Sequence, residues 1–435
     1  AWLRTRRFWV QILAGAPKMN RFKVNKYTLK LILITSIVVK ILVVFLYHSP
    51  RLEDEWLILF NNFEEFKIYS YYNLEGQNIP TSYMPPLYLI FLNINKFLSF
   101  NSFNFVYLVY FSQIVLSTAS VVLFFKFCNY FFDKNFSTVG ATVFAFFPLI
   151  VISNGLISSA CIQIFFYLVF INLVIEIINA QKKINIILFS IVSACCLLLR
   201  GEFLVIFFIS LFYFILNDKK KIKFILIVFF STFIIISPYL VRNYINTNTV
   251  HIVNVTGYAL WKGNNHFRKV EGFHDPLHPD FRESWPDVNQ FNNLYQKLDN
   301  LKINKKYEKD RDQVFLNEAL NNILEDKKNF IILYIKKIVS FFFIDLNSSI
   351  LNYYNLFHII PNILIAILAI PGIFLSLRKK KDTKLLYALI IMLSLILLIS
   401  TFYILPRYKI SIIIFQILFS LFSLEYIYRI FVKKN

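Results

Sequence analysis

The 435-residue sequence predicts an all-α polytopic membrane protein with about ten transmembrane helices, interfacial helices and a long extracytoplasmic loop. Apolar residues make up 57% of the chain and charged residues only 16%, whereas soluble globular chains carry about 25% charged residues. Apolar runs of about 20 residues, the length that crosses a bilayer, recur along the chain. The composition excludes a disordered protein and argues against a soluble enzyme.

The charge distribution supports membrane insertion and indicates a topology. The chain carries a net charge of +21, yet residues 49–104 sum to −3 and residues 241–330 to +1. The basic excess lies in the N-terminal tail, in short connectors and at the C-terminus. This pattern follows the positive-inside rule, not the single basic face of a nucleic-acid-binding protein, so we expect no nucleic-acid partner.

Polar breaks between the apolar runs define the ten predicted spans. They lie near residues 27–48, 105–131, 136–152, 160–179, 184–200, 203–216, 223–240, 358–377, 385–403 and 409–430. Pro238 is expected to end the seventh span, because proline lacks the N–H that continues a helix.

Two further apolar segments are expected to lie in the membrane interface. Pro85–Phe100 has only 16 residues and contains Asn93, Asn95 and Lys96, which is too short and too polar for a span. Counting it as a span would also reverse the side of every later loop. The basic connectors and the basic N-terminal tail would then lie on opposite sides of the membrane. The stretch near 330–346 is interrupted by lysines and is typical of an interfacial amphipathic helix.

This arrangement places both termini in the cytoplasm of a multi-pass cell-membrane protein, a bacterial inner membrane being expected. It divides the chain into a basic cytoplasmic tail (1–26), an N-terminal transmembrane module (27–240) with an acidic first outer loop (49–104), an extracytoplasmic loop with an interfacial helix (241–357) and C-terminal transmembrane helices (358–435). Residues 1–18 differ in composition from the neighbouring part of the chain, which makes Met19 a candidate start of the native protein.

The first outer loop holds the candidate catalytic residues, Asp54 and Glu55 in the run Glu-Asp-Glu-Trp. Adjacent carboxylates raise each other's pKa, and one held near a hydroxyl can act as a general base. The alternative is a solvated start of an acidic loop. Tyr83 and Tyr88 follow in Tyr-Met-Pro-Pro-Leu-Tyr, where the alternative reason for the prolines is the entry angle of a helix.

Four cations at predicted outer ends of spans are candidates for binding a phosphate group. They are Arg200, Arg242, Lys262 and Arg407, with Glu202, Asn243, Asn264 and Tyr408 as accompanying site candidates. A planar guanidinium suits bidentate contact with phosphate. The alternatives are a mutual salt bridge between Arg200 and Glu202, and snorkelling of the other cations towards the headgroups.

Taken in order, these motifs resemble the GT-C membrane glycosyltransferases. The acidic pair, Tyr-x-Pro-Pro-Leu-Tyr, Arg-x-Glu, Pro-Tyr-x-x-Arg-Asn-Tyr, Gly-x-x-Leu-Trp-x-Gly-Asn-Asn and Arg-Tyr are most similar to the family-39-like branch, related to protein O-mannosyltransferases and the lipid A aminoarabinose transferase. The resemblance runs from about residue 27 to 430. It implies a sugar donor linked to polyprenyl phosphate, inversion at the anomeric carbon and Asp54 as base towards the acceptor hydroxyl, with Glu55 as its neighbour.

The resemblance leaves the acceptor and the metal open. The acceptor is a lipid, a polysaccharide or a protein. Relatives often carry a second acid at the start of the fourth span, whereas Gly155–Cys161 contains no carboxylate here. No cofactor is therefore assigned, and a divalent metal, Mg or Mn, stays open. The alternatives to a transferase are a flippase or transporter of lipid-linked oligosaccharides, and a catalytically inactive relative that acts in assembly.

Overall fold

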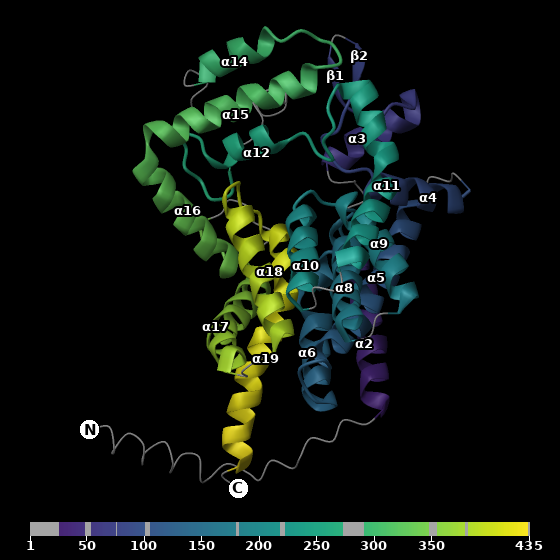
Figure 1. The fold of residues 1–435 in the computed structure, drawn as a ribbon, viewed down its shortest axis with the longest axis vertical. Helices are drawn as coiled ribbons and strands as arrows, with labels where there is room; N and C mark the ends of the chain where they lie inside the picture. The colour runs from purple at the N-terminus through teal and green to yellow at the C-terminus, as the bar shows by residue number, and fades with distance from the viewer. Residues whose placement is uncertain are drawn as a thin grey trace.

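The computed structural model describes residues 26–47, 54–74, 76–100, 105–179, 182–217, 222–272, 291–347, 355–378 and 382–433. These residues form an elongated helical bundle with a helical cap at one end (Figure 1). The first helix begins, and the last helix ends, at the end of the bundle away from the cap. The predicted all-α polytopic class is confirmed. Residues 1–18 and the suggested start at Met19 lie outside the described residues.

Seven described helices are long and apolar enough to cross a membrane. They are α2 (Lys26–Tyr47), α5 (Phe105–Cys128), α8 (Ala160–Asn179), α11 (Ile222–Thr247), α17 (Leu356–Arg378), α18 (Thr383–Ser400) and α19 (Ile410–Lys433). The other predicted spans correspond to shorter helices: α6 (Lys134–Phe146) with α7 (Pro148–Ile152), α9 (Lys183–Leu197) and α10 (Phe203–Asn217). The count of ten crossings stays a prediction.

The predicted continuous span at 136–152 is wrong in one respect, because the helix breaks at Phe147. Pro148 is the first residue of α7, and Phe147 before it is extended, with φ −64° and ψ 127°. The ring of a proline disfavours helical geometry in the residue that precedes it. The chain therefore forms two short helices here instead of one.

The predicted end of a span at Pro238 is also wrong, because α11 continues through this proline to Thr247. A proline inside a helix leaves the carbonyl four residues earlier without its N–H donor. In α11 that carbonyl belongs to Ile234, and the hydroxyl of Ser237 donates to it at 2.8 Å. The side chain replaces the lost backbone bond, so the helix extends beyond the boundary predicted at residue 240.

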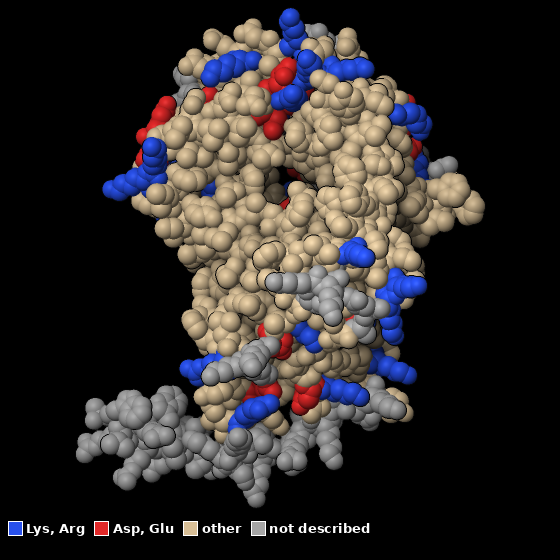
Figure 2. Space-filling view, viewed as in Figure 1, with Lys and Arg blue, Asp and Glu red and all other residues tan. Residues whose placement is uncertain are grey.

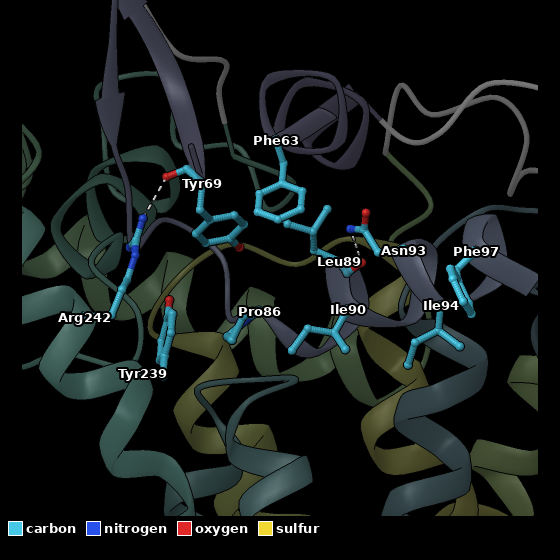
Figure 3. A pocket seen from close by; sticks show the side chains of 10 residues that line it. All are labelled: Phe63, Tyr69, Pro86, Leu89, Ile90, Asn93, Ile94, Phe97, Tyr239 and Arg242. Carbon is cyan, nitrogen blue, oxygen red and sulfur yellow. Dashed lines mark hydrogen bonds between the residues drawn. The ribbon is translucent and has the colours of Figure 1, made fainter. Parts of the chain in front are cut away.

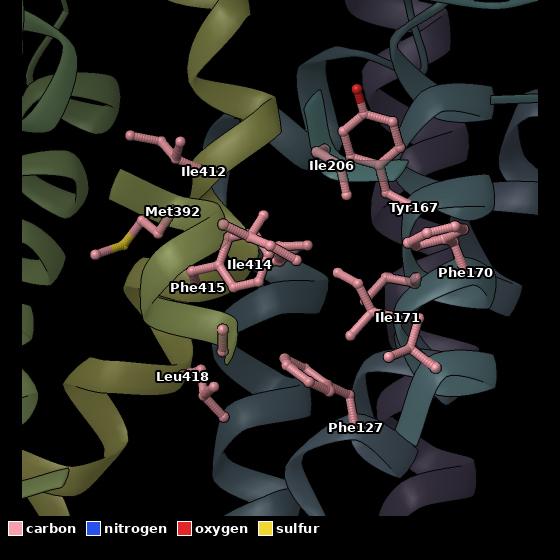
Figure 4. Close-up of a cluster of buried hydrophobic side chains, with 14 of the residues drawn as sticks. Phe127, Tyr167, Phe170, Ile171, Ile206, Met392, Ile412, Ile414, Phe415 and Leu418 are labelled. Carbon is pink, nitrogen blue, oxygen red and sulfur yellow. The ribbon is translucent and has the colours of Figure 1, made fainter. Parts of the chain in front are cut away.

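The core of the bundle lies around α8 and α19. Among the candidate spans these two are the most buried, with 72% and 78% of their most apolar stretch inside the structure, against 11% for α2. Figure 4 shows Ile414 and Phe415 of α19 facing Phe170 and Ile171 of α8 across this core. The remaining helices surround this pair, and their outer faces expose large apolar side chains suited to lipid.

A close approach of two backbones joins α17 to α19. A Cβ atom added at Gly372 would lie 1.8 Å from the carbonyl oxygen of Phe419. No side chain fits this gap. Small residues of this kind let helices in a membrane pack at short range, where van der Waals contact replaces the hydrophobic effect as the attraction.

The cap end consists of two parts that are distant in sequence. One part contains α3 (Asp54–Phe66), a hairpin of β1 (Ser70–Leu74) and β2 (Gln77–Pro80), and α4 (Leu87–Leu98). The other contains α12 (Thr256–Gly263), α14 (Asn292–Asp299), α15 (Tyr307–Glu325) and α16 (Lys327–Phe342). The short helix α4 lies across the direction of the long helices, and α16 runs from the cap down beside α18 (Figure 1).

Charged side chains gather at the two ends of the molecule. In Figure 2 they cover the cap and the opposite end of the bundle, while the surface between is mostly uncharged. An uncharged belt of this kind is what a bilayer requires, since charged groups in its centre are costly.

We expect Gly372→Ala to destabilise the protein by about 1–3 kcal/mol or more, because the added methyl group meets the rigid backbone of Phe419. Thermal unfolding of the purified protein in detergent measures this. Ile367→Val, on an exposed position of the same helix, is the control and should leave the melting temperature nearly unchanged. An unchanged melting temperature in Gly372→Ala would refute the close approach.

Candidate functional site

A cavity of about 750 Å³ lies between the cap and the adjacent end of the bundle. Figure 2 shows an opening in this region with basic and acidic atoms at its floor. Its walls come from α3, the segment before α4, the start of α8, the corner between α9 and α10, α11, α12 and the turn between α18 and α19. Side chains that are far apart in the sequence therefore meet in one space.

Two arginine–glutamate pairs form the polar end of the cavity. Arg200 Nε donates to Glu202 Oε1 at 3.0 Å, and an Arg407 nitrogen lies 3.7 Å from Glu55 Oε2. The ring of Tyr408 is close to both cations, with its centroid 5.5 Å from the guanidinium carbon of Arg200 and 5.9 Å from that of Arg407. All five side chains line the cavity.

The surroundings determine the protonation state of three side chains that line the cavity, Arg200, Tyr83 and Tyr403. Burial lowers the pKa of Arg200, but the carboxylate of Glu202 and nearby tyrosines raise it more, so the net shift is upward. Burial raises the pKa of Tyr83 and, with the charge of Glu55, that of Tyr403. Arg200 therefore stays a cation, and the two phenols stay neutral hydrogen-bond donors.

The other end of the cavity is an apolar groove between α10 and α11. Its lining residues are Leu204, Val205, Phe207 and Phe208 from α10 and Phe229, Phe233, Ile236 and Leu240 from α11. Phe208 and Phe233 are about half exposed, so the groove opens onto the outer surface of the bundle. An amphipathic ligand with a charged head and a long apolar tail fits such a space.

Arg242 lies outside this cavity, although the sequence predicted it as a phosphate ligand. Its guanidinium donates to the carbonyls of Thr81 and Tyr69, at 2.5 and 3.0 Å, and to the side chain of Asn243. Arg242 instead lines a second, shallower groove of about 440 Å³ along α4 with Tyr239, Leu89 and others (Figure 3). Arg242 therefore connects the two ends of the hairpin, because Tyr69 precedes β1 and Thr81 follows β2.

Asn243 and Tyr88 are buried and contact other protein groups. Asn243 donates to the carbonyl of His251 at 2.8 Å. Tyr88 is fully buried, packs edge-to-face on Trp56 and donates to Gln113 at 3.3 Å. Neither side chain lines the cavity.

Lys262 and Asn264, at the end of α12, do not line the cavity either. The ammonium of Lys262 lies 4.6 Å from the ring centroid of Tyr403, which does line it. Asn264 donates to Thr401 O and accepts from the buried Lys337 at 2.9 Å. Lys337 also donates to the carbonyl of Gly263 at 2.8 Å, so it fixes the end of α12 to α16.

Asp54 is the first residue of α3, and its side chain lies outside the described residues. The side chain of Glu55, the next residue, faces the cavity. Tyr83 also lines it and stacks on Tyr71 with ring centroids 4.3 Å apart. The predicted role of Asp54 as base stays a prediction.

Several cavity residues were missed by sequence reasoning. Gln163 donates to Glu202 at 3.4 Å and to Ser411 at 3.2 Å, and the Tyr403 hydroxyl accepts from that of Tyr408 at 2.9 Å. His251 is exposed at the wall formed by the segment after α11. These residues occur in apolar or loop segments without a recognisable motif, so no signal marked them.

The described residues do not fit a metal site. Among them, no group of three or more His, Cys, Asp and Glu side chains could hold an ion. The two described carboxylates of the cavity each lie beside an arginine, which competes with a cation for them.

Solved structures with the same fold belong to an archaeal oligosaccharyltransferase. AglB from Archaeoglobus fulgidus, in complex with an inhibitory peptide and a dolichol-phosphate, superimposes with a TM-score of 0.55 at 14% identity, over 93% of this chain and 51% of that one. An oligosaccharyltransferase from Archaeoglobus fulgidus in the apo form superimposes with a TM-score of 0.54 at 12% identity, over 93% of this chain and 51% of that one. The chain shares the fold of this oligosaccharyltransferase.

The likeness extends to another crystal structure of an Archaeoglobus fulgidus oligosaccharyltransferase. The same oligosaccharyltransferase in complex with Zn and sulfate superimposes with a TM-score of 0.53 at 13% identity, over 92% of this chain and 50% of that one. The chain thus spans about half the length of the structures that it matches. No family model and no curated protein matches the sequence. The relation to the family-39-like branch stays a prediction.

We expect the stability conferred by Lys337 to depend on pH. Burial lowers the pKa of Lys337 from 10.5 to about 7. Below pH 7 the side chain is charged in both the folded and the unfolded state, and the cost of burying the charge is fully present. Between pH 7 and 10.5 only the unfolded state binds the proton, so the free energy of unfolding rises with pH, by an amount on the order of a few kcal/mol.

Lys337→Met removes this titration and is therefore the comparison. The melting temperature of the wild type relative to Lys337→Met should rise from pH 7 to pH 10 in one detergent. A difference that stays constant over this range would contradict a buried lysine with a lowered pKa.

Proposed function

We propose that the chain transfers a sugar from a polyprenyl-phosphate-linked donor to an acceptor hydroxyl at the extracytoplasmic membrane face, with inversion at the anomeric carbon. The observation that carries this proposal is the single cavity that joins two arginines and a glutamate at one end to an apolar groove at the other. The donor has the same two parts, a phosphate and a long apolar tail. The sugar, attached to the phosphate, would lie beside Glu55.

Arg200 and Arg407 are the proposed ligands of the donor phosphate. Preorganised cations stabilise the negative charge that develops on a leaving phosphate. This stabilisation is strongest in a partly dehydrated site. Both guanidinium groups lie beside Tyr408, which positions them on one side of the cavity. The polyprenyl tail would run between α10 and α11, where Phe208 and Phe233 line the groove.

Asp54 is the proposed general base, and Glu55 is its neighbour in the cavity wall. In the reaction the carboxylate takes the proton of the acceptor hydroxyl, whose oxygen forms the new bond to the anomeric carbon. The bond from that carbon to the phosphate oxygen breaks, and polyprenyl phosphate leaves with the electron pair. Attack from the face opposite the leaving group inverts the configuration. Both residues belong to the first turn of α3.

The structural neighbours support the donor class and leave the acceptor open. One AglB structure holds a dolichol-phosphate, and another, with a TM-score of 0.51 at 14% identity, is tethered with an acceptor peptide containing the NVT sequon. A lipid-linked donor is therefore part of our proposal. The acceptor class, a lipid, a polysaccharide or a protein, is to be found by experiment.

We further propose that the cap faces the extracytoplasmic side of the cell membrane and that both termini are cytoplasmic. The beginning of α2 and the end of α19 lie together at the end of the bundle away from the cap, which supports this orientation (Figure 1). The excess of basic residues in the connectors on that side is the expected result of the positive-inside rule.

We expect Asp54→Asn to abolish sugar transfer, with a loss of at least about 100-fold, while insertion and donor binding persist. The purified wild type, given a panel of polyprenyl-phosphate hexoses and pentoses with envelope extract, should release polyprenyl phosphate and form a new glycosidic bond. Glu64→Gln, at the other end of α3 and paired with Lys96, is the control and should keep full activity. Retained transfer in Asp54→Asn would contradict its role as base, and movement of the donor across the bilayer without a new bond would indicate a flippase.

Arg200→Gln and Arg407→Gln should each weaken the binding of polyprenyl phosphate by about tenfold, because each removes a cation from the phosphate site. Native mass spectrometry of the protein in nanodiscs, titrated with polyprenyl phosphate, measures the affinities. Arg268→Gln is the matched control, since Arg268 is an exposed cation of the cap that pairs with Asp326 outside the cavity. Equal affinities in all four proteins would exclude the assigned phosphate site.

A further inference from the structure

The cap helix α15 buries charged side chains on the face that it turns towards the rest of the protein. Glu308 and Arg311 are each only 2% exposed, among the buried aromatic residues Tyr307 and Phe315. Burying a charge is costly unless hydrogen bonds compensate for it. Buried charges at this position therefore need partners, and the partners of Glu308 lie in a segment that continues into a wall of the cavity.

Glu308 holds the segment that precedes α4. Its carboxylate accepts from the backbone N–H of Ser82 at 2.8 Å, from the Ser82 hydroxyl at 2.7 Å and from the Thr81 hydroxyl. On the other side of the same segment, Arg242 of α11 donates to the carbonyl of Thr81. The chain at Thr81–Ser82 is thus fixed between the cap and the bundle.

Asp312 holds the beginning of α12. It lies one helical turn after Glu308, and its two carboxylate oxygens accept from the backbone N–H groups of Gly257 and Tyr258 at 3.0 and 2.9 Å. The approach is so close that a Cβ atom at Gly257 would lie 2.0 Å from the carbonyl oxygen of Asp312. Only glycine permits this contact.

Both held segments form walls of the cavity. Tyr83, Met84 and Pro85 follow Ser82 directly and line it, and Thr256 and Ala259 of α12 line it as well. Neither Glu308 nor Asp312 is a lining residue. One face of α15 therefore fixes two walls of the cavity, although α15 itself does not line it. Arg200 and Arg407, at the polar end of the cavity, belong to the bundle and its turns.

We propose that Glu308 and Asp312 are positioning residues, which hold the cap-side walls of the cavity at the spacing that sugar transfer requires. This inference rests on the proposed function. The phosphate site belongs to the bundle side, so the two carboxylates affect the alignment of the sugar and the acceptor and leave the binding of bare polyprenyl phosphate unchanged. A misplacement of about 1 Å in such a wall is enough to cost about 100-fold in rate.

The test compares two measurements on the full chain in nanodiscs: the rate of sugar transfer from the active polyprenyl-phosphate sugar, and the affinity for polyprenyl phosphate alone. Glu308→Leu and Asp312→Ala should each lower the transfer rate at least about tenfold and keep the affinity within about twofold of the wild type. Glu308→Gln should restore most of the rate, because the amide oxygen can still accept from the Ser82 N–H and hydroxyl, and the Thr81 hydroxyl can turn to accept from the amide nitrogen.

Glu318→Gln is the matched control, since Glu318 lies on the same helix and pairs with Lys297 away from the cavity. Its rate should equal that of the wild type. Ser82→Ala removes one donor from the wall itself and should lower the rate in the same direction, which keeps the test decisive if Glu308→Leu fails to fold.

Three outcomes would overturn the inference. One is an unchanged transfer rate in Glu308→Leu and Ser82→Ala. Another is a parallel loss of rate and phosphate affinity, which would indicate a general loss of structure. The last is the absence of both transfer and polyprenyl phosphate binding in the wild type, which would refute the proposed function and this inference together.

Discussion

Pairing between arginine and glutamate is the interaction on which the site depends. The cavity lies at the end of an apolar bundle, where an unpaired charge would lose most of its hydration. Arg200 with Glu202, and Arg407 with Glu55, keep four charged side chains in this place without a large net charge. At 3.7 Å, the ion pair of Arg407 with Glu55 is longer than a hydrogen bond.

The bundle and the cap contribute different parts of this site. The bundle supplies the arginines and the apolar groove between α10 and α11, and its buried core lies around α8 and α19 (Figure 4). The cap supplies walls that are fixed by hydrogen bonds to backbone groups, such as those of Glu308 to Ser82. A lipid-linked substrate needs both, since its tail must stay in an apolar environment while its sugar reacts in a polar one.

Much of the fold could be predicted from the sequence, because spans depend on local apolar runs. Two helix boundaries differ from the prediction for local reasons that composition does not show. Pro148 interrupts a predicted span, whereas the Ser237 hydroxyl replaces the hydrogen bond that Pro238 cannot donate. The site was predicted less completely. Arg200 and Arg407 do line the cavity, but Arg242 turns to backbone carbonyls, and only the tertiary structure decides which acceptor a guanidinium meets. Gln163 of α8 donates to Glu202 and Ser411, and no sequence motif predicts these contacts.

The most direct test of the account is a cryo-EM map of the full chain in nanodiscs with bound polyprenyl phosphate. The account predicts density for the phosphate between Arg200 and Arg407, and density for the tail along Phe208 and Phe233 between α10 and α11. Phosphate density beside Arg242 in the groove along α4, with an empty cavity under the cap, would contradict it.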